Sequence, residues 1–310
     1  MSPVHYCVPT DTAKALGTDY PLDCDNFGLL LARFVPHEAI RSEKNVDVIR
    51  DHKGKEIDTI RGDWLRKVCK LTPTPAQLEH QKALLARWQA QTKGASHFRM
   101  VARGRLIVGL GGKGALEIGI TLHHTTGLPY IPGSALKGLA RSYALLTLAE
   151  KHNVALDDVE AFDKRLIAGH LDSKEESAPL YREAFGHTVE QKHDIGDSAA
   201  GAVIFYDGVL SVIPNANPLF TVDVMTPHFS EYYRSSGGKA PHDADGPIPV
   251  NYITVAVDVA FDFAVGLRRG GSDEARRQAR KWLRAGLQEM GVGAKTAAGY
   301  GVFMRPPERG

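Results

Sequence analysis

Cysteine and long apolar runs are the first things that this sequence lacks. It has three cysteines, Cys7, Cys24 and Cys69, all in the first quarter and none in a Cys-x-x-Cys pair. That number and spacing exclude a disulfide framework and a thiolate zinc site. No run of about 18 apolar residues is present, and the first residues lack a cationic stretch followed by an apolar one. We therefore expect no membrane span, no secretory signal and a cytoplasmic protein.

A strong excess of one charge is also missing, because the net charge is only +2 over 310 residues. The charges are nevertheless unevenly distributed. Residues 94–141 hold six basic side chains against one acidic one, and residues 265–295 hold eight against three. Residues 150–197 hold twelve acidic side chains against six basic ones. If the two basic segments meet in space, the protein has one positive face. If they do not, both are ordinary solvated surfaces.

The apolar pattern predicts an α+β protein. Residues 1–95 are expected to be a mostly helical N-terminal extension that packs on the core, with a helix from Pro75 to about Gly94. From residue 96 the expected elements are, in order, a strand at 97–110, a short strand at 116–122, a helix at 132–146, a strand at 202–212, a strand at 252–267, a helix at 272–290 and a strand at 300–304. This order is typical of a ferredoxin-like (RRM-like) fold, with an antiparallel sheet and helices on one face.

Two insertions interrupt the expected core of residues 96–310. The acidic region at about 150–198 is expected to contain one or two short helices. Residues 214–250, which are rich in proline and glycine, are expected to form a loop-like excursion. The helix that follows Pro132 is expected to use Gly133 or Ser134 as its N-cap.

Two glycine-rich segments match nucleotide-binding motifs only in part. Gly109-x-Gly-x-x-Gly114 leads into an expected strand, whereas a dinucleotide site requires a helix there. Residues 291–303, Gly-Val-Gly-Ala-Lys-Thr-Ala-Ala-Gly-Tyr-Gly-Val-Phe, lead from a helix into a strand, which is the reverse of a P-loop. Lys295, Thr296 and exposed N–H groups in this segment can hold the phosphates of a polymer. The alternative is a helix C-cap at Gly291 and a bulge in an edge strand.

Basic side chains recur at helical spacing on both expected core helices. Ser134, Lys137 and Arg141 lie beside the apolar stripe of the first helix, whose N-terminus also suits an anion. On the second helix a similar row consists of Arg277, Arg280 (or Lys281) and Arg284. A solvated face is the stronger alternative for this second row, because no glycine-rich segment flanks it.

No tight metal-binding or catalytic pattern is present, so we expect no metal and no cofactor. None of the histidine clusters reproduces His-Glu-x-x-His, and each is expected to lie on the surface. The clusters are His123-His124, His187 with His193, Asp194 and Asp197, and His228 with His242, Asp243 and Asp245. A metal-independent ribonuclease needs only one positioned histidine, so the pattern leaves His37 and His123 open as an acid or base.

Several segments together resemble the RAMP (repeat-associated mysterious protein) superfamily of CRISPR systems. They are Gly109-Leu-Gly-Gly, Gly119-Ile-Thr-Leu-His-His, the stretch 127–141 with Pro-Gly-Ser-Ala-Leu-Lys-Gly-Leu-Ala-Arg, and the glycine-rich loop at 291–303. Residues 26–34, 223–233 and 241–249 are similar to the sixth-subunit family of type III-B (Cmr) effector complexes. The matches extend from about residue 26 to residue 303.

The resemblance implies a non-catalytic subunit that binds CRISPR RNA near its 3′ end and caps a stack of RAMP subunits. The implied partners are CRISPR RNA, target RNA, the other RAMP subunits and the small helical subunit, with no membrane. Residues 214–250 are implied to form a thumb-like projection against the guide–target duplex. The expected RNA-binding residues are Lys113, Ser134, Lys137, Arg141, Gly293, Lys295, Thr296, Gly299 and Tyr300, with Arg103, Arg105, Arg277 and Arg284 as further candidates.

Two other functions stay open at this point. One is a RAMP-type, metal-independent endoribonuclease that processes precursor CRISPR RNA with a histidine acid or base. The other is a protein–protein scaffold that contacts no RNA. No aspartate of this chain matches the one with which the backbone subunit of such complexes cuts target RNA, so we expect no catalytic residue.

Overall fold

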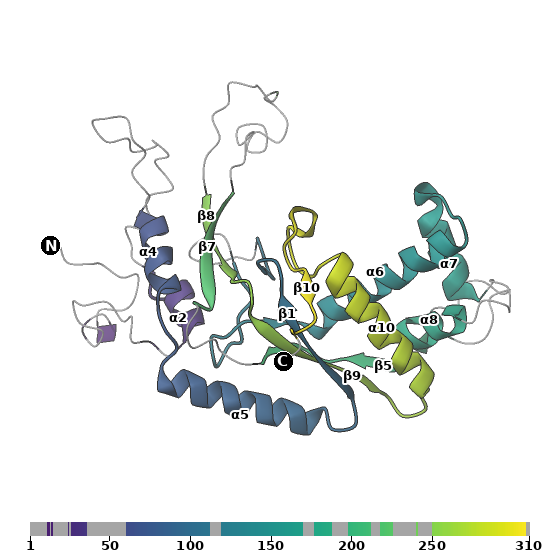
Figure 1. Ribbon diagram of the computed structural model, residues 1–310, viewed down its shortest axis with the longest axis horizontal. Coiled ribbons are helices and arrows are strands. Elements are labelled where there is room, and N and C mark those ends of the chain that lie inside the picture. Colours follow the sequence, from purple (N-terminus) through teal and green to yellow (C-terminus); the bar gives the residue numbers. More distant parts are fainter. Residues whose placement is uncertain are drawn as a thin grey trace. The chain divides into compact units, whose positions relative to one another are not determined.

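The computed structural model describes residues 11–12, 14, 24, 26–35, 60–111, 119–169, 177–187, 198–211, 218–225, 240 and 250–307 (Figure 1). They fall into two compact units. The first unit is drawn from residues 1–78, 109–128 and 214–256, and the second unit from residues 79–108, 129–213 and 257–310. The expected division of the chain near residue 95 stays a prediction.

The second unit is built on one antiparallel sheet with the strand order β10-β1-β9-β6-β2, in which β5 also pairs with β9. Its strands are β1 (Ser96–Ala102), β2 (Tyr130–Ile131), β5 (Val203–Phe205), β6 (Gly208–Leu210), β9 (Ala260–Leu267) and β10 (Phe303–Met304). When β5 and β6 are counted as one interrupted strand, the core strands lie side by side in the order fourth, first, third, second. This is the ferredoxin-like arrangement, so the predicted fold class is confirmed.

Two helices, α6 (Gly133–Lys151) and α10 (Asp273–Glu289), cover one face of this sheet. They pack on each other, and α10 also packs on β9. The helices approach closely at Gly286, where an added Cβ would lie 3.1 Å from Cγ of Leu139. Facing the helices, the Phe303 ring meets the rings of Phe261 and Phe263 edge to face, with centroids 5.9 and 5.7 Å apart. The core of the unit therefore lies between β9, β10 and the helix pair.

The start of α10 is capped by a serine, one of the residues that favour this position. Ser272 is the N-cap, and its Oγ accepts a hydrogen bond from the Ala275 N–H at 3.1 Å. Glu183, in the acidic region, accepts from the Ser272 N–H at 2.6 Å and from its hydroxyl at 2.8 Å. The helix ends at Glu289, so the expected helix over residues 272–290 is confirmed.

The acidic region contributes to the core. It contains η1 (Leu156–Asp158), α7 (Val159–Ala168), α8 (Ser177–Phe185) and the paired strands β3 (Gly186–His187) and β4 (Ala199–Ala200). Phe185 stacks on Phe205 and on Trp282, with ring centroids 5.9 and 5.8 Å apart. The predicted short helices are confirmed within the described residues, but α8 is a packed part of the unit and not a solvated insertion.

A third helix, α5 (Pro75–Gln91), lies on the other face of the sheet, and its bounds agree with those predicted. Trp88 packs with Val209 and Ala264, and its Nε1 donates to the Asp207 carbonyl at 3.0 Å. Because Ala264 alternates along β9 with Phe263, which faces α6 and α10, α5 must cover the opposite face.

The first unit combines α2 (Phe27–Ala32) and α4 (Ile60–Cys69) with the antiparallel pair β7 (Phe220–Met225) and β8 (Val250–Val255). Helix α4 packs on both strands. The rings of Phe27 and Phe220 meet edge to face with centroids 5.0 Å apart. The described part of the N-terminal segment is thus helical, as predicted.

Several strand predictions were wrong in their bounds. The strand expected at 202–212 is divided, within the described residues up to 211, into β5 and β6, because Tyr206 and Asp207 interrupt the ladder between them. Residues 252–267 are divided between β8 and β9, because Asp258 has a positive φ of 64°, which ends a strand. Residues 220–225, expected to be loop, form β7, whose alternation was obscured by the prolines around it.

The strands at the two ends of the predicted core are shorter than expected. The first ends at Ala102 and not at residue 110, and the last spans only Phe303–Met304 and not 300–304. Residues 112–118 lie outside the described residues, and the described part of the expected strand at 116–122 belongs to no strand. None of the helices that the structure describes combines the length and the apolar character needed to span a bilayer.

Candidate nucleic-acid interface

The glycine-rich loop between α10 and β10 is held against the segment that follows β1. Inside the loop, the Val292 N–H donates to the Gly301 carbonyl at 2.9 Å. Outside it, the Gly301 N–H donates to the Arg105 carbonyl at 2.7 Å, and the Ala294 N–H to the Ile107 carbonyl at 2.9 Å. The loop is therefore closed on itself and attached at two points to residues 105–107.

Most of the loop glycines bring protein backbone close to protein backbone. An added Cβ at Gly301, where φ is 67°, would overlap the Val292 carbonyl oxygen, and one at Gly293 would overlap the Ile107 carbonyl oxygen. Gly299 is different, because its φ is 84° but its added Cβ would meet no atom within 4 Å. These glycines are therefore needed for the close backbone packing within the loop. Gly299, at the tip, is the loop glycine with open space beside its Cα.

Two backbone N–H groups at the loop tip have no partner among the described residues. Lys295 and Gly299 are both left-handed, and they flank the 3-10 turn η2 (Thr296–Ala298). The Ala298 N–H donates to the Lys295 carbonyl, and the Gly299 N–H donates to the Thr296 carbonyl, both at 2.9 Å. Among the described residues, no hydrogen-bond acceptor lies within reach of the Thr296 and Ala297 N–H groups. Successive N–H groups in such a turn form an anion-binding concavity.

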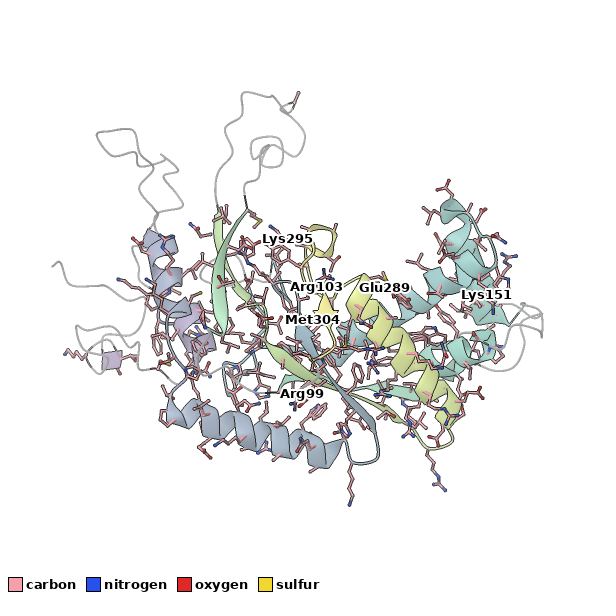
Figure 2. The ribbon with its side chains drawn as sticks, in the orientation of Figure 1. Arg99, Arg103, Lys151, Glu289, Lys295 and Met304 are labelled. Carbon is pink, nitrogen blue, oxygen red and sulfur yellow. The ribbon has the colours of Figure 1, made fainter. Side chains whose placement is uncertain are left out.

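One lysine lies on this tip, and two arginines lie on the segment to which the loop is attached. Lys295 Nζ lies 5.8 Å from the centroid of the Tyr300 ring. Arg103 and Arg105 are exposed and lie on the segment that carries the loop, since the Arg103 N–H donates to the Val302 carbonyl at 2.9 Å. Figure 2 shows Arg103 and Lys295 at the same end of the second unit. The loop tip and these cations together suit phosphate groups.

A second set of arginines continues along the same edge of the sheet. The guanidinium carbons of Arg280 and Arg284 lie 5.4 and 5.7 Å from the centroid of the Phe98 ring on β1. Burial, then repulsion from Arg280 and Arg305, lowers the pKa of Arg284. Because Val101 pairs with Met304, Arg305 comes next to Met100, between the loop and Phe98. We call the set Lys295, Arg103, Arg105, Arg305, Arg284 and Arg280 the edge track.

The N-terminus of α6 does not have the form that the sequence predicted. The N-cap of α6 is Pro132, not Gly133 or Ser134. The Pro132 side chain makes no capping hydrogen bond to the helix. Instead the carboxylate of Asp207, between β5 and β6, accepts a hydrogen bond from the Gly133 N–H at 2.6 Å. Ser134 is exposed in the first turn. The chain's own carboxylate therefore occupies the place that the sequence suggested for an external anion.

Lys137 and Arg141 form a separate basic cluster with Arg268. Burial is the main cause that lowers the pKa of Lys137, and repulsion from Arg268 and Arg141 adds to it. Arg141 Nη2 also forms an ion pair with Asp163 at 2.6 Å. The same carboxylate accepts from the Tyr181 hydroxyl at 2.7 Å, which, after burial, helps to raise the pKa of Tyr181. Arg141 is therefore partly neutralised by the protein.

The loop and the start of α6 are built on different strands. The loop rests on the segments that continue β1 and lead into β10, whereas Gly133 lies against Phe205 and Asp207 at the β5–β6 junction. Strand β9 lies between these strands, which puts about two strand spacings, roughly 10 Å, between them. Of the predicted RNA-binding residues, the structure brings together those of the loop with Arg103 and Arg105, and separately Lys137 with Arg141.

Sequence reasoning missed Arg305, Arg268, Asp207 and Asp163, and it left Arg280 out of the candidate set. Arg305 and Arg268 each come directly after a core strand, where a basic side chain is a weak signal by itself. No pattern in the sequence connects Asp207 or Asp163 with the helix start. Arg277 is exposed on α10, three residues before Arg280.

Several other candidates lie outside the described residues. They are Lys113, His37, His193, Asp194, Asp197, His228, His242, Asp243 and Asp245. Of the described candidates, His123 Nδ1 lies 3.1 Å from the Thr125 hydroxyl. In the part of the chain that the structure describes, no three His, Cys, Asp or Glu side chains are grouped as metal ligands.

Comparison with known proteins connects this unit to one family. The model of the RAMP superfamily matches residues 99–303, which include the whole edge track except Arg305.

Two curated relatives carry the same subunit name. The CRISPR system Cmr subunit Cmr6 of Pyrococcus furiosus is 34% identical over 222 residues, which are 64% of this chain and 64% of that protein. The match thus spans less than two thirds of that relative. Cmr6 of Saccharolobus solfataricus is 23% identical over 291 residues, covering 90% of this chain and 85% of that protein.

Among solved structures, the chain resembles a chain of the type III-B Cmr-beta complex bound to cognate target RNA. The TM-score is 0.50 at 22% identity, over 78% of this chain and 69% of that chain. At that identity the likeness concerns the fold alone.

Proposed function

The chain belongs to the RAMP superfamily, and from that membership we propose that it is the Cmr6-type subunit of a type III-B CRISPR RNA-guided effector complex. The sequence similarity to the two Cmr6 proteins supports this assignment, with 34% identity over 222 residues to one and 23% over 291 residues to the other. The shared fold with a chain of a Cmr complex agrees with it.

Within that complex, the chain binds the backbone of CRISPR RNA near the 3′ end and caps the stack of RAMP subunits. The observation that carries the RNA-binding part is the loop tip, where the N–H groups of Thr296 and Ala297 follow Lys295 and meet no acceptor among the described residues. Backbone N–H groups and cations contact phosphates irrespective of sequence, which is what a subunit that binds guides of many sequences requires.

The crowding of cations along the edge track also supports this function. Arg284 is partly buried and repelled by Arg280 and Arg305, which is why its pKa is lowered. Like charges held close together destabilise the unliganded protein, and a polyanion that lies across them removes the repulsion. Gly293, Gly299 and Tyr300 shape the same surface. Ser134, Lys137 and Arg141 make a secondary contact, because Asp207 and Asp163 already neutralise part of that region.

The partners in this proposal are CRISPR RNA, target RNA, the neighbouring RAMP subunits and the small helical subunit, in the cytoplasm. We assign residues 214–250, of which 214–217, 226–239 and 241–249 lie outside the described residues, as the thumb against the guide–target duplex. The subunit itself is non-catalytic and takes no cofactor.

Salt-dependent RNA binding tests the electrostatic part. The full chain is titrated against fluorescein-labelled single-stranded repeat RNA by fluorescence anisotropy at several salt concentrations. Contacts with about four phosphates give a log–log slope near −3, at roughly −0.7 per phosphate. A slope near zero would remove the phosphate-binding role.

The place of contact and the rival functions are separated in two further measurements. Ultraviolet crosslinking within the assembled effector complex is expected to label peptides that contain residues 99–105 and 291–305. Crosslinks to no peptide of this chain would favour the protein scaffold instead. Incubation of the chain alone with repeat RNA in EDTA is expected to leave the RNA intact, and specific cleavage would favour the endoribonuclease.

A further inference from the structure

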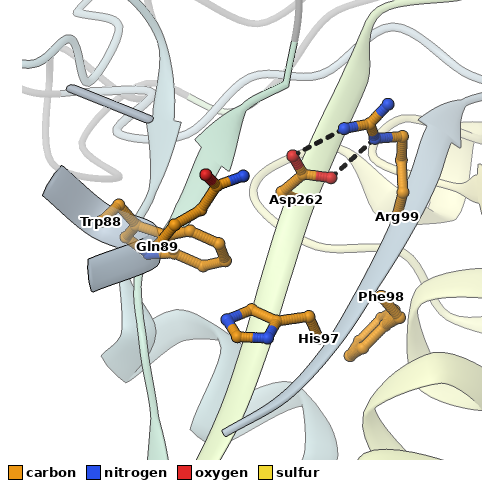
Figure 3. Close-up of a pocket in the computed structure, with 6 residues that line it drawn as sticks. All are labelled: Trp88, Gln89, His97, Phe98, Arg99 and Asp262. Atoms are coloured by element: carbon orange, nitrogen blue, oxygen red, sulfur yellow. Dashed lines mark hydrogen bonds and ion pairs between the residues drawn. The ribbon is translucent and has the colours of Figure 1, made fainter. Parts of the chain in front are cut away.

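A hollow of about 530 Å³ opens on the sheet face opposite α6 and α10 (Figure 3). It lies between α5 and the strands β1 and β9. Its lining residues are Trp88, Gln89, His97, Phe98, Arg99 and Asp262. Volumes of about 300–1,000 Å³ are usual for small-molecule sites. None of these residues belongs to the edge track.

The position of the hollow follows from strand alternation. The side chains of Phe98 and Met100 face the helices, so Phe98 borders the hollow only from within β1, and His97 and Arg99 face the other way. Arg99 pairs in register with Asp262 of β9. Figure 3 shows His97, Asp262 and Arg99 around the hollow, with the Gln89 amide directed toward the Asp262 carboxylate from α5. The hollow therefore has a strand floor and walls of planar, polar-edged side chains.

Arg99 supplies a fixed planar cation. Its Nε donates to Asp262 Oδ1 at 2.7 Å and its Nη2 to Oδ2 at 3.0 Å. These hydrogen bonds are the main cause that raises the pKa of Arg99, so the guanidinium is always charged. The carboxylate is 12% exposed but the Arg99 side chain 47%. The two parallel bonds fix the plane of the guanidinium while leaving part of it accessible for stacking.

His97 supplies a second oriented ring. Its Nε2 lies 2.7 Å from Oγ1 of Thr92, a buried residue. The Thr92 hydroxyl donates its one proton to the Trp88 carbonyl at 2.8 Å. The His97 Nε2 must then be the donor in the Thr92 pair, so that in the neutral imidazole Nδ1 is the acceptor. The Trp88 ring meets the imidazole edge to face, with centroids 5.4 Å apart. The ring is thus held in place by two neighbours.

The spacing of these two side chains suits a flat ligand. His97 and Arg99 are two residues apart on one face, so their Cα atoms are about 6.8 Å apart along the strand. That is about twice the ~3.5 Å contact distance between carbon atoms. The spacing of the two strand positions therefore leaves room for one aromatic ring between them.

We propose that this hollow binds one unpaired nucleobase. The base stacks on the Arg99 guanidinium and the His97 ring, and the Gln89 amide and His97 Nδ1 offer hydrogen bonds to its edge. Unpaired bases are recognised in this way, on aromatic rings and arginine planes. The inference rests on the proposed function in one respect, because it takes RNA as the source of the base.

The charge of the hollow favours a base over a phosphate. Asp262 already neutralises the Arg99 guanidinium through two hydrogen bonds. A phosphate placed here would lie close to the Asp262 carboxylate, whereas a neutral, flat and polar ring meets no such repulsion. The hollow and the edge track thus differ in the part of a nucleotide that each one suits.

Nucleotide titration of the full chain tests the proposal without any polymer. The ¹⁵N indole signals of the tryptophans are followed by NMR, with Trp88 assigned through Trp88→Phe. The four nucleoside 5′-monophosphates are compared with ribose 5-phosphate, which lacks a base. We expect at least one nucleotide to shift the Trp88 signal saturably, and ribose 5-phosphate to leave it unchanged.

Two variants and one control locate the effect. His97→Ala is expected to weaken nucleotide binding at least fivefold, as the loss of one stacking partner does. Arg99→Lys keeps a cation for Asp262 but replaces the planar guanidinium with an ammonium group, and it is expected to weaken nucleotide binding as well. The melting temperature of each variant is measured in parallel. Lys82→Ala, on the exposed side of α5, serves as the matched control and leaves binding unchanged.

Three results would overturn the proposal. They are equal shifts with ribose 5-phosphate, no saturable shift at about 10 mM of any nucleotide, and unchanged binding in both His97→Ala and Arg99→Lys. Failure of the proposed function is a different result, namely no binding of repeat RNA by the wild-type chain in the anisotropy titration. The nucleotide titration stays conclusive in that case.

Discussion

The glycine loop at residues 293–300 and the start of α6 at residues 133–137 contain the same ingredients in different arrangements. Both combine backbone N–H groups with a lysine, and both are typical of phosphate sites when read from sequence. At the start of α6 the Gly133 N–H donates to the Asp207 carboxylate at 2.6 Å. In the loop, the N–H groups of Thr296 and Ala297 meet no acceptor among the described residues.

The difference teaches that an anion-binding motif depends on what the rest of the chain puts beside it. A helix N-terminus attracts any carboxylate within reach. Asp207 belongs to the same chain and is held beside the helix start, so it competes with any external anion for this position. In the loop, by contrast, Thr296 and Ala297 follow the left-handed Lys295, and no acceptor among the described residues meets their N–H groups. The loop is accordingly the better candidate for contact with RNA.

The largest expected effect concerns the glycines that build the loop. Gly301→Ala is expected to destabilise the chain by more than about 3 kcal/mol, because overpacking alone costs about 1–3 kcal/mol and a left-handed residue adds about 1–2 kcal/mol. Gly299→Ala has the same backbone strain but open space around its Cβ, so a loss of only about 1–2 kcal/mol is expected. Urea unfolding measures both.

The matched pair sharpens the comparison because both glycines have a positive φ. Equal losses for the two variants would mean that backbone strain alone, and not the close approach of Val292 to Gly301, shapes the loop. In that case the distinction between close backbone packing at Gly301 and open space at Gly299 would be wrong.

The next effect concerns the cap of α6. Asp207→Ala removes the acceptor for the Gly133 N–H and is expected to destabilise the chain by about 0.5–2 kcal/mol, the usual range for loss of an N-cap. Asp207→Asn keeps an acceptor and is expected to lose less. Thermal unfolding of both variants at neutral pH measures the difference. An unchanged stability in Asp207→Ala would show that the helix start does not depend on this carboxylate.

The smallest effect concerns Lys137. Because burial and two neighbouring arginines lower the pKa of Lys137, the folded chain holds this proton less tightly than the unfolded chain. Stability therefore rises as the pH increases toward the ordinary lysine pKa of about 10.4. Lys137→Met is expected to raise the melting temperature slightly at pH 7, with the gain vanishing above about pH 10.5. A lowered melting temperature at pH 7 would contradict this electrostatic account.

Much of the fold could be predicted from periodicity and caps. The Ser272 cap and the apolar stripe fixed the position of α10, and the order of elements was enough for the ferredoxin-like arrangement. The breaks at Asp207 and Asp258 could not be predicted, because both depend on contacts between distant strands. The strand β7 was hidden by the prolines near it.

The candidate site was only partly predictable for the same reason. The loop residues were predicted from the resemblance to the RAMP superfamily, and the glycine-rich pattern by itself pointed only to Lys295 and Thr296. Arg305 joins the edge track only through the pairing of β10 with β1, which sets Met304 opposite Val101. The partner of Gly133, 74 residues away, has no signature in sequence.

One comparison of variants tests the central claim most directly. The double variants Arg103→Gln/Lys295→Gln and Lys137→Gln/Arg268→Gln remove the same charge from the two regions. Their binding to single-stranded repeat RNA is measured by anisotropy over a range of salt. The loop pair is predicted to lose at least about tenfold in affinity and about 1.4 from the magnitude of the salt slope, and the helix pair less than about threefold. Equal losses, or a larger loss in the helix pair, would contradict the account.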